Sequence, residues 1–207
     1  MKNIVKKHHV RNMMHYCALL ILPLMMLTAC SETNDEEVEF PNWKETNERA
    51  FAALYNMVAQ NTDPTSPWKL FNVYSKTEDM NPQMEDYIVV REITRGKVSG
   101  SPLFTDSVSI HYRGRLLPST TYTEGYIFDS SWQGEYNPDT MTPFESLPVS
   151  SYIDGFATAL QHMQIGDRWE VYVPYQLGYG ATAMTNPTIP AYSMLIFDVT
   201  LVGYKRR

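Results

Sequence analysis

The sequence predicts an α+β fold in which an antiparallel β-sheet curls around one short α-helix, preceded by a helical N-terminal extension. Three observations support this prediction. Residues 152–163 have the three- and four-residue apolar spacing of a helix, and residues 168–173 alternate like a strand. Further short alternating runs lie between residues 86 and 204. One helix among several strands is typical of an α+β domain.

The predicted helix has one apolar and one polar face. Its apolar face consists of Ile153, Phe156, Leu160 and Met163. Thr158 falls on the polar face, and Gly166 is expected to end the helix in a left-handed conformation. A helix of about three turns is not stable alone in water. We therefore expect it to pack on the strand that follows, in which Trp169, Val171 and Val173 share one face.

The first 29 residues have the pattern of a secretory leader. Basic residues precede an apolar run, residues 17–27, which is shorter than the roughly 20 residues of a membrane-spanning helix. The sequence Leu27-Thr28-Ala29-Cys30 resembles a bacterial lipobox, whose cysteine is lipidated and becomes the mature N-terminus. We predict a lipoprotein signal peptide over residues 1–29 and lipidation of Cys30, for example with palmitate. A plain signal peptide and an uncleaved anchor are the alternatives.

Residues 30–40 form a predicted acidic tether between the lipid and the domain. Five acidic and no basic residues lie between Ser31 and Glu39, which is typical of a solvated linker. An acidic run after a lipidated cysteine also resembles surface-export signals of some Gram-negative lineages. Both interpretations place the chain in the cell envelope.

Cysteine content and charge exclude several classes of protein. The only cysteines are Cys17 and Cys30, so the chain after residue 30 has no thiol for a disulfide or a cysteine metal site. The leader holds 4 of the 17 basic residues and none of the 23 acidic ones, which leaves 13 minus 23, a net charge of −10. This charge argues against nucleic acid as a partner.

Residues 41–85 form a predicted helical extension. Apolar spacing indicates a helix over residues 41–60, which residues 61–64 end. This helix either docks on its own domain or serves as a dimerisation arm. Residues 68–74 suit a short strand. Residues 86–207, the predicted main domain, are expected to fold without the extension.

The main domain is predicted to be rich in strands. Alternation indicates strands over residues 87–93, 107–117, 126–131, 144–149 and 194–204, with a long loop at residues 132–142. In the second of these strands, Val108, Ile110 and Tyr112 share a face, and His111 lies on the opposite one.

The sequence lacks the common patterns of catalytic and cofactor sites. After the leader only His111 and His162 remain, and neither has the spacing of a metal ligand, so both suit structural roles with satisfied ring nitrogens. There is no nucleophile elbow, phosphate-binding loop or dinucleotide fingerprint. We therefore expect no cofactor and no metal.

A series of motifs in a fixed order is more specific. It runs Val108-x-Ile110-His111-Tyr112-x-Gly114, Phe128-Asp129-Ser130-Ser131, Phe144, Ile153-x-Gly155-Phe156, Tyr179-Gly180 and Ile189-Pro190-Ala191-x-x-x-Leu195-x-Phe197. This order resembles the FKBP-type peptidyl-prolyl isomerases, the tacrolimus-binding family, over residues 86–204.

The resemblance implies a half-barrel sheet wrapped on the helix, with a shallow apolar pocket at one end. The implied catalytic residues are Tyr112, Phe128, Asp129, Tyr179 and Phe197. The implied substrate-binding residues are Phe144, Tyr152, Ile153, Phe156 and Ile189. The chain departs from the best-known members at three of its positions, which are Phe156 in place of tryptophan, Ser146 in place of a second aromatic residue and Tyr152 in place of valine.

Such a pocket needs no nucleophile. Rotation about an X–Pro bond is slow because amide resonance must be broken, with a barrier on the order of 20 kcal/mol. An apolar pocket removes the water that stabilises the planar amide while it holds the proline ring. The resemblance implies that the Tyr179 hydroxyl and the Ile189 backbone N–H donate to substrate carbonyls. It implies that Asp129 accepts a hydrogen bond from the peptide or orients Tyr112.

The main hypothesis is therefore a peptidyl-prolyl isomerase that assists the folding of envelope proteins. It would be lipid-anchored to the outer membrane, at the periplasmic side or the cell surface. The expected partners are proline-containing polypeptides and, by resemblance, tacrolimus-type macrolides. Two alternatives remain, which are a non-catalytic peptide-binding or chaperone module that uses the same pocket, and a structural envelope protein.

Overall fold

The computed structural model of the protein describes residues 39–206. The predicted leader, the lipidation residue Cys30 and nearly all of the acidic tether lie outside these residues. Within the described residues, no helix combines the length and the apolarity that a membrane span requires.

The described chain forms one antiparallel sheet, a small hairpin and two α-helices. The strands are β1 (Trp68–Asn72), β2 (Tyr87–Thr94), β3 (Ser107–Arg115), β4 (Ile127–Ser130), β5 (Phe144–Pro148), β6 (Arg168–Val173), β7 (Met184–Thr185), β8 (Thr188–Ile189) and β9 (Leu195–Lys205). The helices are α2 (Trp43–Ala59) and α3 (Asp154–His162), with short 3₁₀ turns η1 (Glu78–Met80), η2 (Met84–Asp86), η3 (Val149–Ser151) and η4 (Tyr175–Leu177).

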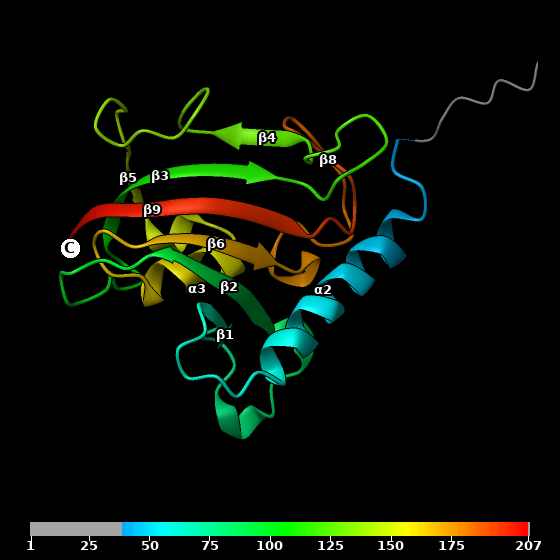
Figure 1. Ribbon diagram of the computed structural model, residues 1–207, viewed down its shortest axis with the longest axis horizontal. Coiled ribbons are helices and arrows are strands. Elements are labelled where there is room, and N and C mark those ends of the chain that lie inside the picture. The colour runs from blue at the N-terminus through cyan, green and yellow to red at the C-terminus, as the bar shows by residue number, and fades with distance from the viewer. Residues whose placement is uncertain (1–38, 207) are drawn as a thin grey trace, which may run out of the picture. The chain divides into compact units, whose positions relative to one another are not determined.

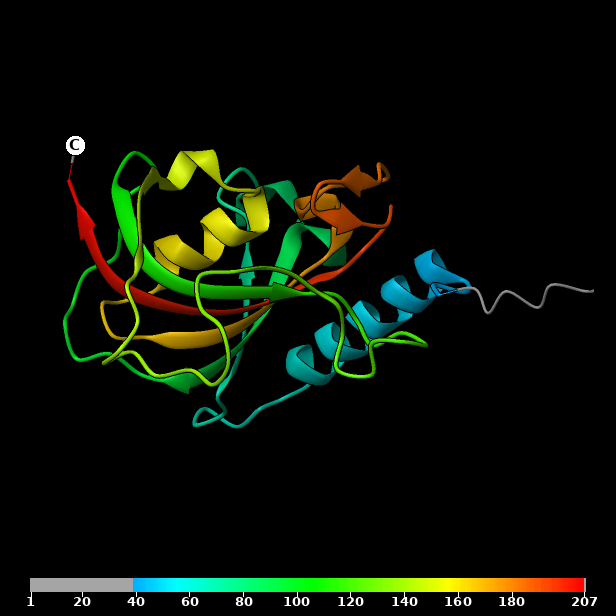
Figure 2. The ribbon, with the colours of Figure 1, turned by 90° about the horizontal axis from the view of Figure 1, so that it is seen from above.

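The main sheet has the strand order β1-β2-β6-β9-β3-β4, and β5 also pairs with β3 (Figure 1). All of its pairs are antiparallel, and β7 and β8 form the separate hairpin. The pairing register shifts inside four strand pairs, for example between Ser109 and Ile110 where β3 meets β9. Such bulges bend a strand and increase its twist. The sheet consequently curves around α3 (Figure 2), as the sequence predicts.

Helix α3 lies on the concave face of the sheet and completes the main core. Phe156 and Leu160 are buried there with Val171 and Leu201 of the central strands. A Cβ atom on Gly155 would lie 2.3 Å from Val173 Cγ1, so only glycine allows this close packing of helix and strand. Two details of the predicted helix are wrong. First, Thr158 is buried, and its hydroxyl is satisfied inside the core because it donates to the Asp154 carbonyl at 2.8 Å.

The second error concerns the end of the helix. Helix α3 ends at His162, whereas Gly166 adopts its left-handed conformation, φ 93°, in the turn that follows. The Gly166 N–H donates to the Leu201 carbonyl at 2.8 Å, and the turn therefore faces β9. The position of Gly166 in this turn depends on its hydrogen bond to β9, and residue spacing along the chain does not reveal such a contact.

Helix α2 docks on the opposite face of the same sheet. Phe51 and Val58 of α2 are buried with Val89 of β2 and Ile196 of β9. Ile88 and Val90, which flank Val89 in the strand, belong to the core around α3. The first half of β2, residues 88–90, is therefore buried on both faces, because a helix covers each of them (Figure 2). Of the two roles open from sequence, these contacts favour a helix docked on its own domain.

The residues before position 86 also contribute a strand to the sheet. Strand β1 pairs with β2 over its whole length, from the Trp68–Arg91 pair to the Asn72–Tyr87 pair. The described chain accordingly belongs to one compact unit. The folding of residues 86–207 without the extension stays a prediction, and this pairing argues against it, because β2 would become an unpaired edge without β1.

A loop covers the other end of the convex face. Tyr136, in the predicted long loop, donates from its hydroxyl to Thr200 Oγ1 at 2.8 Å and lies against His111 at 5.8 Å between ring centroids. His111 is therefore buried, although the alternation places it on an outer face. Its Nδ1 has no hydrogen-bond partner among the described residues, which contradicts the expectation of a satisfied histidine.

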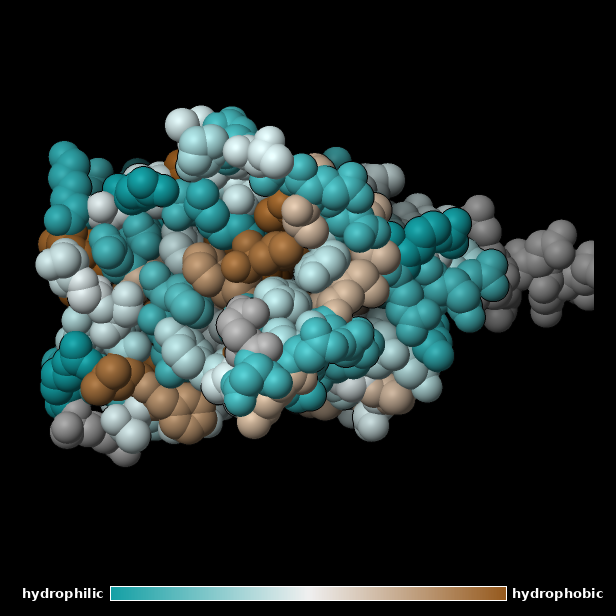
Figure 3. All heavy atoms as spheres, turned by 90° about the horizontal axis from the view of Figure 1, so that it is seen from below, coloured by the Kyte–Doolittle hydropathy of each residue, from teal (hydrophilic) through white to brown (hydrophobic). Residues whose placement is uncertain are grey.

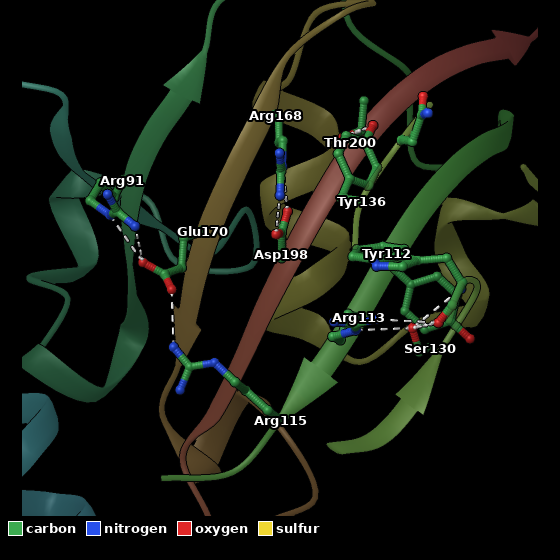
Figure 4. Close-up of polar contacts among 12 residues, drawn as sticks. Arg91, Tyr112, Arg113, Arg115, Ser130, Tyr136, Arg168, Glu170, Asp198 and Thr200 are labelled. Carbon is green, nitrogen blue, oxygen red and sulfur yellow. Dashed lines mark hydrogen bonds and ion pairs between the residues drawn. The ribbon is translucent and has the colours of Figure 1, made fainter. Parts of the chain in front are cut away.

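Ion pairs connect the strands between these two covered ends. Glu170 Oε2 lies 2.8 Å from Arg91 Nη2, and Glu170 Oε1 lies 3.0 Å from Arg115 Nη2 (Figure 4). Burial raises the pKa of Glu170, but hydrogen bonds from Tyr172 and Arg91 outweigh it and hold the pKa below its usual value. Glu170 thus links β2, β3 and β6 as a carboxylate.

Elsewhere the surface is mixed. Figure 3 shows a face on which polar residues surround a smaller apolar patch. Apolar atoms make up much of the surface of any folded domain. We therefore assign no role to this patch.

Candidate active site

An aromatic cavity of about 210 Å³ opens where β3, β4 and β9 meet the start of α3. It is lined by Tyr112, Phe128, Asp129, Ser151, Tyr152, Ile153, Phe156, Tyr179 and Phe197. Eight of these nine residues are among the ten site residues predicted from sequence. The fold therefore brings together side chains that lie up to 85 positions apart in the chain.

Two buried rings form the base of the cavity. Phe156 of α3 and Phe197 of β9 are almost fully buried, and their ring centroids lie 4.7 Å apart at 56°. Phe128 stands edge-on to Phe197 at 5.7 Å, and the Tyr152 ring lies 5.2 Å from Phe156. Tilted and edge-to-face contacts are favourable for aromatic rings and fix their orientation. The base and walls are thus one packed aromatic cluster.

Gly114 makes room for this cluster on β3. A Cβ atom at this position would lie 2.4 Å from Phe128 Cζ and 3.0 Å from Phe197 Cε1. Contacts this short are not tolerated, so any side chain at residue 114 would displace the Phe128 ring from its present position. The glycine of the Tyr112-x-Gly114 motif is therefore required for the observed packing of Phe128 and Phe197.

Tyr112 and Asp129 form the polar edge of the cavity. The Tyr112 hydroxyl donates to Asp129 Oδ2 at 2.7 Å, and the Ser130 N–H donates to Asp129 Oδ1 at 2.8 Å. Burial, followed by the hydrogen bond to Asp129, raises the pKa of Tyr112 far above its usual value. Tyr112 consequently keeps its proton at neutral pH and directs it at Asp129. Of the two roles implied for Asp129, this contact favours the orientation of Tyr112.

Hydrogen bonds behind the wall hold β4 against β3. The Tyr112 N–H donates to Ser131 Oγ at 2.9 Å, and the Ser131 N–H donates to the Tyr112 carbonyl at 2.8 Å. Arg113 points away from the cavity, where its Nε donates to Ser130 Oγ at 3.3 Å (Figure 4). The serines that follow Phe128 and Asp129 therefore fix the strand that carries them.

Two further tyrosine hydroxyls belong to the cavity walls. Burial raises the pKa of Tyr152 to about 12, and its hydroxyl has no hydrogen-bond partner in the described part of the chain. Burial, with a smaller contribution from Asp129, raises the pKa of the half-exposed Tyr179. Both hydroxyls are therefore protonated at neutral pH. Because Tyr179 is exposed whereas the Tyr152 hydroxyl is buried, Tyr179 is the one of the two that suits a donor to a peptide carbonyl.

The structure does not place two of the predicted residues on the cavity wall. Phe144 lies beside the cavity, half-exposed, with its ring 5.8 Å from that of Tyr112. The Ile189 side chain is buried in the core, so only its backbone is left for the predicted role. Sequence reasoning missed Ser151, whose one signal is its position directly before Tyr152. The side chain of Ser146 lies outside the part that the structure describes.

The described residues contain no group of three His, Cys, Asp or Glu side chains that could hold a metal ion. A larger cavity of about 450 Å³ lies between α2 and η4, with Phe51 and Met194 among its walls. None of the predicted site residues lines it. The aromatic cavity is therefore the better candidate for catalysis.

Comparison with known proteins identifies the domain. A family model described as FKBP-type peptidyl-prolyl cis-trans isomerase matches residues 100–202. This match contains every residue that lines the aromatic cavity. The chain carries an FKBP-type peptidyl-prolyl cis-trans isomerase domain. Helix α2, β1 and β2 precede the matched part of this FKBP domain.

Curated relatives agree with this assignment. The macrophage infectivity potentiator of Trypanosoma cruzi is 39% identical over 118 residues, 57% of this chain and 53% of that protein. The FKBP-type 22 kDa peptidyl-prolyl cis-trans isomerase of Escherichia coli is 35% identical over 129 residues, 62% of this chain and 54% of that protein. Outer membrane protein MIP of Legionella longbeachae is 34% identical over 102 residues, 49% of this chain and 38% of that protein. The chain thus spans about half or less of these relatives.

Solved structures show the same fold. A peptidyl-prolyl cis-trans isomerase from Pseudomonas syringae has a TM-score of 0.52 and 23% identity, over 79% of this chain and 96% of that one. At this identity the likeness concerns the fold alone. It confirms the α+β architecture with a bent antiparallel sheet.

Proposed function

We propose that the protein catalyses the cis–trans isomerisation of X–Pro bonds in polypeptides. The observation that carries this proposal is the convergence of six aromatic residues, with Asp129 at their edge, around one cavity of the FKBP domain. The rings belong to Tyr112, Phe128, Tyr152, Phe156, Tyr179 and Phe197. Apart from Asp129, no charged side chain lines this cavity, so the site suits a neutral ring.

Desolvation and shape are the proposed sources of catalysis. The planar amide is charge-separated and prefers water, whereas the twisted transition state has lost that resonance. A proline ring on Phe156 would place the preceding amide inside the aromatic walls, where water is excluded. The pocket then destabilises the planar form relative to the twisted one and lowers the barrier. No covalent intermediate is needed.

Hydrogen-bond donors at the edge orient the peptide. Tyr179 is half-exposed and protonated, which suits a donor to a substrate carbonyl. The Ile189 backbone N–H remains the second proposed donor. Asp129 accepts from Tyr112 at 2.7 Å, so we assign it the orientation of that ring and no role as a general base.

We propose that the protein acts in the cell envelope, anchored by lipid at Cys30 to the outer membrane, at its periplasmic side or at the cell surface. The lipobox-like sequence Leu27–Cys30 supports this location, as does the similarity to outer membrane protein MIP of Legionella longbeachae. The proposed clients are proline-containing envelope proteins during folding. Metabolic labelling with palmitate should label wild-type protein and not Cys30→Ala. Equal labelling of both chains would refute the anchor.

A protease-coupled assay tests the activity directly. The substrates are Ala-X-Pro-Phe peptides with X varied, because the protease cleaves only the trans form. The peptide molecules that start in the cis form are cleaved only after they isomerise, which gives a slow phase of cleavage. We expect wild-type protein to accelerate this slow phase. A tacrolimus-type macrolide, the second proposed class of ligand, should inhibit that acceleration. If wild-type protein leaves the slow phase unchanged yet suppresses the aggregation of an unfolded client, the cavity is a binding module and the proposal is wrong.

A further inference from the structure

We propose that α2, a helix outside the matched FKBP family region, is a positioning element of the active site and acts chiefly through Asn47. This inference rests on the proposed isomerase function. It concerns two segments, called here the Tyr179 loop (residues 175–180) and the Pro190 loop (residues 190–194). The first carries Tyr179 into the cavity, and the second follows Ile189 directly. Both proposed substrate donors therefore depend on where these loops lie.

Buried hydrogen bonds tie α2 to the Pro190 loop. Asn47 is almost fully buried, and its Oδ1 accepts from the Met194 N–H at 2.8 Å. Trp43 Nε1 donates to Ser193 Oγ at 2.8 Å, and that hydroxyl donates to the Pro190 carbonyl at 2.6 Å. Hydrogen bonds in a dry environment are costly to break, because the abandoned group has no water to replace its partner. The helix consequently fixes the loop at both ends.

Tyr192, at the middle of the Pro190 loop, is held in a strained conformation. Its φ of 63° is left-handed, which is unfavourable for a bulky residue. Such a conformation persists only where the surroundings hold it. Here Lys44 Nζ of α2 lies 5.0 Å from the Tyr192 ring centroid, and the Tyr175 ring meets that ring edge-on at 5.2 Å. One contact comes from α2 and the other from the Tyr179 loop.

Two backbone hydrogen bonds connect Tyr192 to the Tyr179 loop and so restrict the position of Tyr179. The Tyr192 N–H donates to the Gly180 carbonyl at 3.0 Å, and the Gly180 N–H donates to the Tyr175 carbonyl at 2.8 Å. The Tyr175 hydroxyl returns to α2, where it donates to Glu48 Oε1 at 3.2 Å. Tyr179 thus directly precedes Gly180, which belongs to a continuous series of contacts from Lys44 to Glu48 of α2, called here the α2 contact circuit.

Catalysis and binding should respond differently if this account is right. The Tyr179 hydroxyl does its work when the substrate carbonyl has rotated, so a misplaced donor weakens the transition state more than the bound peptide. A helix that only stabilised the fold would lower the melting temperature without changing kcat at a temperature where the protein is folded.

The test compares Asn47→Ala with Val58→Ala in the full chain. Val58 is buried on the same helix but makes no hydrogen bond to either loop, so it serves as the matched control for lost packing. We expect Asn47→Ala to lower kcat by roughly fivefold with KM changed less than twofold. We expect Val58→Ala to lower the melting temperature and leave kcat unchanged. Equal kcat in the two variants would overturn the proposal.

Hydrogen exchange gives a second readout that needs no activity. In Asn47→Ala the amide protons of Gly180 and Tyr192 should exchange at least tenfold faster, whereas Val58→Ala should leave their exchange relative to the central strands unchanged. If Asn47→Ala does not fold, Ser193→Ala, which removes the hydroxyl that joins Trp43 to the Pro190 carbonyl, should accelerate the same two amides. Unchanged exchange overturns the positioning role. A wild-type protein without isomerase activity would instead refute the proposed function and leave the exchange result to decide this one.

Discussion

The two parts of the folded chain differ in how they serve the site. Residues 100–202, the family-matched region, supply all the side chains that line the aromatic cavity. Residues 39–99, the leading region, supply none of them, yet they contribute β1, β2 and a helix on the opposite face of the sheet. The side chains that line the cavity are therefore concentrated in a few sequence motifs. The residues that hold the sheet beneath them are spread over a region without any such motif.

The largest effect should come from removing the leading region. Deleting residues 39–80 removes α2 and β1, which leaves β2 without a partner on one edge and uncovers Val89 and Ile196. We expect loss of the cooperative thermal transition, measured by circular dichroism. A deletion variant that still melts cooperatively would show that the leading region is dispensable for folding.

The next largest effect should come from a wall of the cavity. Phe128→Ala removes a ring that contacts Phe197 at 5.7 Å, which opens the cavity to water. We expect kcat/KM for an X–Pro peptide to fall by roughly tenfold or more, about 1.4 kcal/mol. The control is Met57→Ala, at an exposed residue of α2, which should not change kcat/KM. An unchanged kcat/KM in Phe128→Ala would place the chemistry elsewhere.

Asp129→Ala should reduce activity with little loss of stability. The carboxylate is exposed and contributes modestly to the free energy of unfolding. We expect kcat/KM to fall roughly tenfold while the melting temperature changes little. Tyr112→Phe removes the donor of the same hydrogen bond. If Asp129 acts by orienting Tyr112, the double variant should lose no more than the larger single loss, and additive losses would refute that role.

The smallest effect concerns His162, where the two regions meet. Its ring stacks on Phe71 of β1 at 4.2 Å and on Tyr74 at 5.0 Å, and burial lowers its pKa below the ordinary 6.5. At a pH between the lowered pKa of folded His162 and its ordinary pKa of 6.5, the unfolded chain therefore binds more protons than the folded one. The free energy of unfolding should be constant above about pH 6.5 and should fall as the pH drops below it, down to the folded pKa.

Urea unfolding at pH 7.5 and pH 5.5 measures this effect. His162→Phe keeps a stacking ring that does not titrate, so it should lose less stability between these pH values than the wild type. Some loss should remain, because burial also lowers the pKa of His111. Equal losses in both chains would show that His162 is not held in its neutral form.

Most of the fold and the cavity could be predicted because they depend on local patterns. The alternation of Trp169, Val171 and Val173 reports one buried face, and it is confirmed in β6. The cavity residues follow a family order that survives in sequence. The burial of Val89 and His111 could not be predicted, because each is covered by a distant segment, α2 or the loop at Tyr136. The hydrogen bond between Asn47 and Met194 could not be predicted for the same reason, because it joins distant segments.

Exchange spectroscopy of an X–Pro peptide tests the central claim most directly. In two-dimensional NMR, cross peaks between the cis and trans proline resonances report the rate of isomerisation while both forms bind and dissociate. We expect a catalytic amount of wild-type protein to produce these cross peaks and Phe128→Ala to weaken them strongly, with peptide binding little changed. Peptide resonances that shift on binding but show no exchange peaks would contradict the account and make the aromatic cavity a binding site alone.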